Sequence, residues 1–163
     1  MAEYKRLEHT LSPIFNKASK ILILGSFPSV KSRENGFYYG HPQNRFWKVL
    51  AGIYRCELPV TIQNKKDMLL NYHIAIWDVI ESCEIIGSSD VSIKNVVPTD
   101  LNRILKQSDI SKIYTNGKVA GKLYCKHSKE MTGRDNIELP STSPANATFS
   151  LEKLIKQWSI INS

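Results

Sequence analysis

The sequence predicts an α/β protein, a three-layer α/β/α sandwich with a central, mostly parallel four-stranded sheet. Four short β-type runs recur along the chain, at residues 20–24, 73–77, 112–115 and 136–139. Helical patterns lie between these runs. Strands that alternate with helices favour right-handed crossovers and a parallel sheet with both faces covered.

Each element has a local signal. The first run, Ile21 to Leu24 after Lys20, is continuously apolar, as in a strand buried on both faces. Residues 44–54 and 149–158 carry apolar side chains at the three- and four-residue spacing of an amphipathic helix. Shorter stripes of the same kind follow the second and third runs. The apolar positions are Phe46, Trp47, Leu50, Leu101, Ile104, Leu105, Val119, Leu123, Tyr124, Leu151, Leu154, Ile155 and Trp158.

Length and composition predict one globular domain over residues 1–163. Hydrophobic residues make up 42% of the chain and charged residues 23%, which is ordinary for a folded protein. The apolar runs are too short to span a bilayer and the first residues do not form a secretory signal, so we expect a cytoplasmic protein. Three widely separated cysteines form no ligand cluster, so we expect no metal and no cofactor.

The charge balance points weakly to a polyanionic partner. Twenty-two Lys and Arg residues against fifteen Asp and Glu give a net charge of +7. Such a charge is typical of nucleic-acid-binding proteins, but many basic proteins bind no nucleic acid.

Polar, irregular sequence follows three of the predicted strands. These segments are residues 25–47, residues 115–118 and residues 140–147. If the strands are parallel, all three loops leave the same edge of the sheet, where α/β proteins bind ligands. The sequence therefore predicts one crevice lined by three loops.

These loops carry motifs that are similar to a known family. Gly25-Ser-Phe-Pro28 is followed by Gly-Phe-Tyr-Tyr-Gly-His-Pro-Gln-Asn-Arg-Phe-Trp-Lys-Val over residues 36–49, and the third loop reads Ser141-Thr-Ser-Pro-Ala-Asn-Ala147. Together they resemble the uracil-DNA glycosylase superfamily. Phe27 stands where the mismatch-specific uracil enzymes have a water-activating Asn, and Ser141 stands where others have a His. The chain is in this respect most similar to the hypoxanthine-DNA (deoxyinosine) glycosylases.

The resemblance implies the roles of several residues. Asn44 is implied to be the main catalytic residue and Asn116 to assist it, and Tyr39 matches the position of a stacking Phe. Each also has a plainer interpretation from the residues alone. Asn44 suits the N-cap of the helix that follows, Asn116-Gly117 is a common turn pair, and Tyr39 suits a core position.

The remaining candidate residues would bind the base or the DNA. Ser26 offers a polar group to the base or completes a turn, and Phe27 would form a wall of the base pocket. Small polar side chains suit phosphate and minor-groove contacts, although an ordinary turn has the same composition. Lys118, at the start of a helix, would meet a phosphate or remain solvated. The predicted DNA-binding residues are Ser141, Thr142, Ser143, Asn146 and Lys118.

The chemistry would proceed without a carboxylate pair. Many sugar hydrolases flank the scissile bond with two carboxylates, and none is visible here, since Glu34 is the one acid of the first loop and Asp78 is distant in sequence. Neutral amide donors would instead stabilise the departing base. The resemblance implies a monofunctional, monomeric DNA glycosylase that flips a deaminated base out of DNA and leaves an abasic site, with hypoxanthine as the expected base.

Three alternatives remain at this point. The first keeps the fold but makes uracil or a mismatched base the substrate. The second is a protein that binds damaged DNA without catalysis. The third uses Gly25-Ser-Phe-Pro28 as a phosphate loop of a small-molecule enzyme, although this segment lacks the endings of nucleotide-binding loops.

Overall fold

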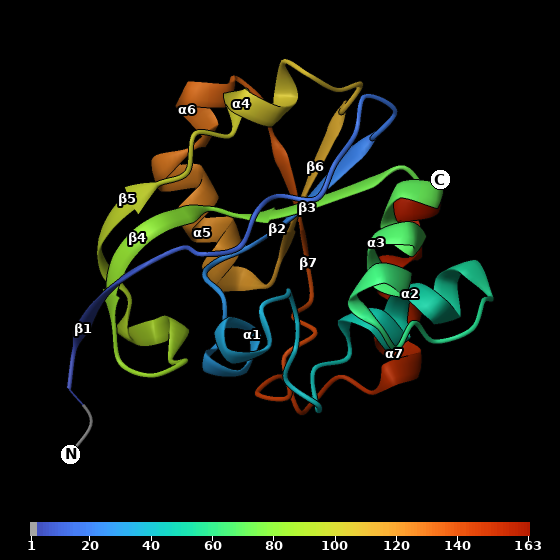
Figure 1. Ribbon diagram of the computed structural model, residues 1–163, viewed down its shortest axis with the longest axis horizontal. Helices are drawn as coiled ribbons and strands as arrows, with labels where there is room; N and C mark the ends of the chain where they lie inside the picture. Colours follow the sequence, from blue (N-terminus) through green and yellow to red (C-terminus); the bar gives the residue numbers. More distant parts are fainter. Residues whose placement is uncertain (1–2) are drawn as a thin grey trace.

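The central sheet has the predicted strands in parallel order. A computed structural model describes residues 3–163 (Figure 1). The four strands are β2 (Ile21–Gly25), β3 (Ile74–Asp78), β6 (Lys112–Asn116) and β7 (Asn136–Leu139), in the spatial order β3-β2-β6-β7. All three neighbouring pairs are parallel. The α/β/α prediction is confirmed, and no strand boundary differs from the predicted one by more than one residue.

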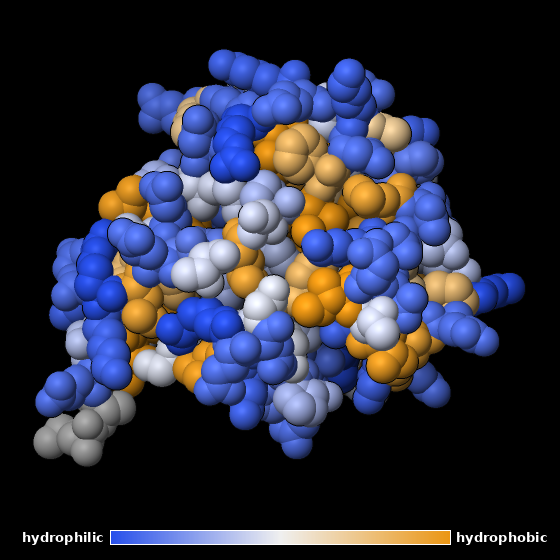
Figure 2. Space-filling view, viewed as in Figure 1, coloured by the Kyte–Doolittle hydropathy of each residue, from blue (hydrophilic) through white to orange (hydrophobic). Residues whose placement is uncertain are grey.

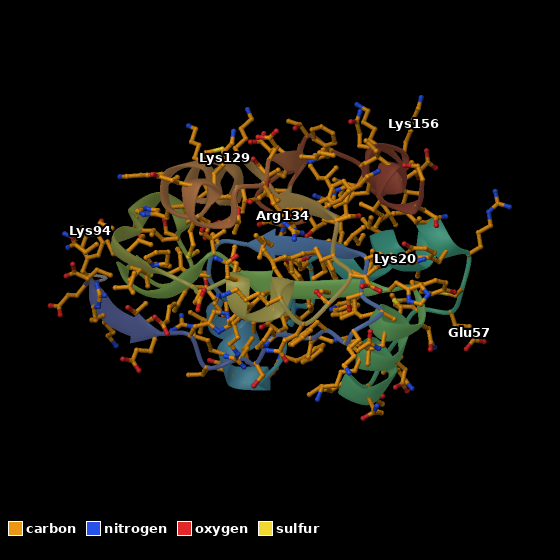
Figure 3. All side chains as sticks on the ribbon, turned by 90° about the horizontal axis from the view of Figure 1, so that it is seen from above. Lys20, Glu57, Lys94, Lys129, Arg134 and Lys156 are labelled. Atoms are coloured by element: carbon orange, nitrogen blue, oxygen red, sulfur yellow. The ribbon has the colours of Figure 1, made fainter. Side chains whose placement is uncertain are left out.

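Helices lie on both sides of this sheet. In Figure 3, the ribbons of α5 (Lys118–His127) and α7 (Leu151–Trp158) lie above the strands, whereas α1 (Val30–Asn35) and α3 (Ile62–Asn71) lie below them. Helix α2 (Phe46–Tyr54) packs against α7. The shorter helices are α4 (Asn102–Leu105), α6 (Lys129–Thr132), η1 (Asp90–Ser92) and η2 (Ser159–Asn162).

Capping side chains explain where three helices begin. Ser29, Thr61 and Ser150 precede α1, α3 and α7, and each accepts a hydrogen bond from the backbone amide three residues later. Helices α1 and α3 were not predicted, because their apolar stripes are short. No helix within residues 3–163 is long and apolar enough to cross a membrane.

A second, antiparallel sheet was not predicted. It consists of β1 (Lys5–Glu8), β4 (Ile80–Ile85) and β5 (Lys94–Pro98) in the order β1-β4-β5. One residue, Val79, separates the end of β3 from the start of β4, so the chain passes directly from one sheet to the other. Strands β1 and β5 are short and mostly exposed, which leaves little periodic signal in the sequence.

The core lies between the parallel sheet and its helices. The largest fully buried side chains include Trp158, Tyr114, Tyr124 and Phe46. Burial of each such side chain contributes about 2 kcal/mol or more through the hydrophobic effect. A smaller cluster of Phe27, Ile80, Cys83 and Ile85 joins the first loop to the second sheet. On the face that Figure 2 shows, hydrophilic residues predominate, with apolar side chains visible between them.

Candidate active site

The three predicted loops converge on one cavity at the carboxyl ends of β2, β3 and β6. The cavity has a volume of about 340 Å³, which is within the usual range for small-ligand sites. Figure 1 shows the segment after α1 and the segment before α7 lying together beneath the sheet. The predicted site residues that line this cavity are Ser26, Phe27, Tyr39, Asn44, Asn116, Ser141, Thr142 and Ser143.

A chain of hydrogen bonds joins the two predicted catalytic amides through Thr142. Asn116 Nδ2 donates to Thr142 Oγ1 at 3.0 Å, and this hydroxyl donates to Asn44 Oδ1 at 2.9 Å. The backbone amide of Thr142 donates to Asn116 Oδ1 at 3.0 Å. Thr142 is completely buried. The direction of these bonds fixes which end of each amide carries the oxygen.

Asn44 also supports the helix that follows it. Its Oδ1 accepts a second hydrogen bond, from the backbone amide of Phe46 at 3.0 Å. Helix α2 begins at Phe46 with Arg45 in the N-cap position. The two interpretations of Asn44 are therefore compatible in one geometry. Its oxygen has two internal donors, while its Nδ2 has no hydrogen-bond partner among the described residues.

Tyr39 lies on the cavity wall with one ring face already covered. Its ring stacks on Phe46 at a centroid distance of 4.0 Å and an angle of 16°. Its backbone has φ = 53°, an uncommon conformation for a residue other than glycine. The hydroxyl is buried without a hydrogen-bond partner among the described residues. Burial raises the pKa of Tyr39, and the negative charge of Asp78 raises it further.

Ser26 and Phe27 form the wall on the side of the second sheet. Both are 7% exposed, and the backbone oxygen of Ser26 accepts a hydrogen bond from the amide of Ile80 at 3.2 Å. The rings of Phe27 and His9 pack in a T-shaped arrangement, with their centroids 6.0 Å apart. Phe27 thus packs in the small hydrophobic cluster and also lines the cavity.

The structure also brings two carboxylates to the cavity, although no pair was visible in the sequence. Asp78 and Asp90 both line it. Desolvation raises the pKa of the Asp90 carboxyl, the Ser26 side chain lowers it, and the charge of Asp78 raises it. Asp78 directly follows a predicted strand, so its place at the sheet edge was visible in the sequence. Asp90 lies in η1, after strand β4. Because β4 was not predicted, nothing in the sequence placed Asp90 near the cavity.

Arg45 holds the third loop against helix α2, a role that the sequence did not reveal. Its guanidinium donates to the backbone oxygens of Ser143 at 3.1 Å and Asn146 at 3.0 Å, and also to that of Phe149. Its own backbone amide donates to the oxygen of Thr142 at 3.0 Å. One side chain therefore organises a loop about 100 residues away along the chain.

The predicted DNA-binding residues occupy different surroundings. Thr142 is interior, so its hydroxyl serves the amide chain and is not positioned for a phosphate contact. Lys118 and Asn146 lie outside the cavity and line a neighbouring hollow of about 750 Å³, together with Ser141 and Ser143. Gly117, at φ = 96°, allows these loops to meet, because a Cβ there would lie 3.0 Å from the Cβ of Ser141.

Positive charge is spread over the surface. Figure 3 shows Lys94, Lys129 and Lys156 pointing outward from well-separated elements. Lys129 is paired with Asp135 at 3.0 Å. Within residues 3–163, no three His, Cys, Asp or Glu side chains are grouped as metal ligands.

Comparisons with known proteins agree with this architecture. A family model described as the Uracil DNA glycosylase superfamily matches residues 12–161. A hypoxanthine DNA glycosylase of Methanosarcina barkeri is 34% identical over 114 residues, covering 67% of this chain and 70% of the relative. A hypoxanthine DNA glycosylase of Methanosarcina acetivorans is 32% identical over 139 residues, covering 84% and 87%.

A solved structure has the same fold over nearly the whole chain. The solution NMR structure of a candidate uracil DNA glycosylase from Methanosarcina acetivorans gives a TM-score of 0.80 at 28% identity, covering 94% of this chain and 95% of the other. The match of the family model over residues 12–161 spans all three loops of the cavity. The chain therefore belongs to the uracil DNA glycosylase superfamily.

Proposed function

We propose that this protein is a monofunctional DNA glycosylase that flips hypoxanthine out of DNA and hydrolyses its N-glycosidic bond. The observation that carries the proposal is the polar cavity in which Thr142 orients the amides of Asn44 and Asn116. Support for the substrate comes from the two relatives, both named hypoxanthine DNA glycosylase.

The amides provide the stabilisation that the reaction needs. Cleavage of the bond to the sugar leaves negative charge on the departing base, and fixed neutral donors stabilise such charge effectively in a desolvated site. In our proposal, Asn44 is the main catalytic residue, because its Nδ2 is free to donate while its oxygen is held by Thr142 and Phe46. Asn116 assists by orienting Thr142.

The cavity walls would hold the flipped base. Tyr39, backed by Phe46, offers the ring face on which the base stacks, and stacking of this kind contributes ~1–3 kcal/mol per base. Ser26 and Phe27 enclose the base from the side of the second sheet. Ser141, Ser143, Asn146 and Lys118 would contact the DNA around the cavity mouth. In this proposal the protein acts as a monomer on duplex DNA.

A base-release screen tests the proposal. Duplexes and single strands with one hypoxanthine, uracil, xanthine or mismatched thymine are incubated with excess enzyme, and abasic sites are detected by alkaline cleavage. We expect the fastest release from inosine-containing duplexes and no strand cleavage before the alkali step. Faster release of uracil or thymine would change the substrate to the alternative base. Tight binding without release of any base would overturn catalysis in favour of a damaged-DNA-binding protein.

A further inference from the structure

Asp78 has one carboxylate oxygen held from behind by a buried histidine. His9 Nε2 lies 2.7 Å from Asp78 Oδ2, and both side chains are 5% exposed. His9 Nδ1 accepts a hydrogen bond from the backbone amide of Leu11 at 3.2 Å. This contact places the proton of a neutral imidazole on Nε2. His9 Nε2 therefore donates to Asp78 Oδ2.

The other oxygen of Asp78 lies over Gly25 at the floor of the cavity. A Cβ at Gly25 would be 2.5 Å from Asp78 Oδ1 and 3.2 Å from the Tyr39 hydroxyl oxygen, so the absence of a side chain makes room for both groups. No hydrogen bond from another described residue reaches this Oδ1. A buried carboxylate is costly unless its oxygens find donors, so the position suits a donor on a bound ligand.

Deamination creates such a donor on the base. Adenine has an unprotonated ring nitrogen N1, which accepts hydrogen bonds, whereas hypoxanthine has an N1–H group, which donates them. A carboxylate can only accept. It would therefore bind the N1–H of hypoxanthine and repel the lone pair on N1 of adenine.

We propose that His9 is a positioning residue that fixes the Asp78 carboxylate so that Oδ1 accepts the N1–H of hypoxanthine, which makes Asp78 the residue that discriminates hypoxanthine from adenine. This inference rests on the proposed function and adds the atom of the base that is recognised. His9 acts through Asp78 and does not touch the base.

The test compares a base that has the N1–H with one that lacks it. Release is measured under single-turnover conditions from duplexes containing 2′-deoxyinosine or 1-methyl-2′-deoxyinosine. The wild type is compared with Asp78→Asn, His9→Ala and His9→Gln, and Asp109→Asn, an exposed site, is the control. In Asp78→Asn, the His9 donor holds the amide oxygen and turns the NH₂ group toward the cavity. Because Asn matches Asp in size, any steric effect of the methyl group stays constant.

We expect Asp78→Asn to slow release from inosine by about 10- to 100-fold, as for loss of a hydrogen bond to a charged group, with little change for 1-methylinosine. The ratio of the two rates should fall in His9→Ala and recover in His9→Gln, whose amide can donate to Asp78. A purely structural role of His9 would lower the melting temperature but leave this ratio unchanged.

Two results would overturn the inference, and they are distinguishable. If the wild type releases hypoxanthine but Asp78→Asn slows both substrates equally, Asp78 acts in water activation or folding, and the proposed function stands without this inference. If the wild type releases no base from any duplex, the proposed function itself fails, and the inference fails with it.

Discussion

Asn44 shows how one residue can serve both the fold and the reaction. Its Oδ1 accepts hydrogen bonds from Thr142 Oγ1 and from the backbone amide of Phe46. Its Nδ2 makes no hydrogen bond with another described residue. Asp has the same shape and the same accepting oxygen but lacks the NH₂ group. The Asn44→Asp substitution therefore separates the two roles.

We expect Asn44→Asp to unfold at a temperature close to that of the wild type, because both accepting contacts remain and a negative charge near a helix N-terminus is favourable. Single-turnover release of hypoxanthine should fall by about 10²- to 10³-fold, as when one donor to a developing anion is removed. Thermal unfolding and a release assay measure the two effects. A rate within threefold of the wild type would show that Nδ2 is not needed.

Tyr39 carries a buried hydroxyl that makes no hydrogen bond with any other residue of the described part of the chain, 3–163. Tyr39→Phe should raise the free energy of unfolding by about 1 kcal/mol in urea denaturation, because the cost of burying an unpaired hydroxyl disappears. The ring face remains, so hypoxanthine release should change by less than about threefold. Tyr39→Ala is the comparison, and it should lose the stacking contribution of ~1–3 kcal/mol. A large loss of the hypoxanthine release rate in Tyr39→Phe would show that the hydroxyl, and not the ring face, supplies the contribution of Tyr39.

At the scale of elements, the site depends on how the third loop is tied to α2 and α7. Arg45 binds three backbone oxygens of this loop, and Trp158 Nε1 donates to the oxygen of Pro140 at 2.8 Å. Within the loop, Asn146 Nδ2 also donates to the oxygen of Ser141 at 3.0 Å. Two helices distant in sequence thus fix the position of Thr142.

Arg45→Ala should reduce the free energy of unfolding by about 2 kcal/mol, since charged hydrogen bonds to the loop are lost together. Amide hydrogen exchange over residues 141–149 should accelerate more than exchange in the central sheet. Lys48→Ala, at an exposed position of the same helix, is the matched control and should change neither quantity. Unchanged exchange in the loop would contradict the role of Arg45.

At the scale of the whole molecule, the net charge of +7 is distributed over many elements. If the protein attracts DNA only through its overall charge, substituting any surface lysine should weaken DNA binding equally. If a specific phosphate contact exists near the cavity, a lysine there should matter more than a distant one. Helix α5 offers a direct comparison, because Lys118 lies at its start beside the cavity loops and Lys126 lies in its last turn.

Lys118→Gln should weaken binding to an inosine-containing duplex and reduce the slope of log K against log salt concentration by about 0.9, the value for one lost phosphate contact. Fluorescence anisotropy at several salt concentrations measures this slope. Lys126→Gln removes the same charge at the other end of the helix and should leave the slope nearly unchanged. Equal effects of the two substitutions would indicate general attraction alone.

The parallel sheet and the crevice at its edge could be predicted from the order of the elements along the chain. The strands are short and apolar, the helical stripes between them are regular, and parallel strands bring their following loops to one edge. Tyr39, Asn44 and Asn116 became candidates through the resemblance of the loop motifs to the family, because each also has a plainer local interpretation. The strand pattern also placed Asp78 at the end of a strand, but it did not indicate that His9 would contact this carboxylate.

The tertiary structure alone decided the contacts that span long stretches of chain. His9 meets Asp78, Arg45 meets the loop of residues 143–149, and Asp90 reaches the cavity from beyond β4. The second sheet could not be predicted because β1 and β5 are stabilised by pairing with β4 and by little burial of their own. Such contacts have no periodic signature, since they depend on where the folded chain brings single side chains together.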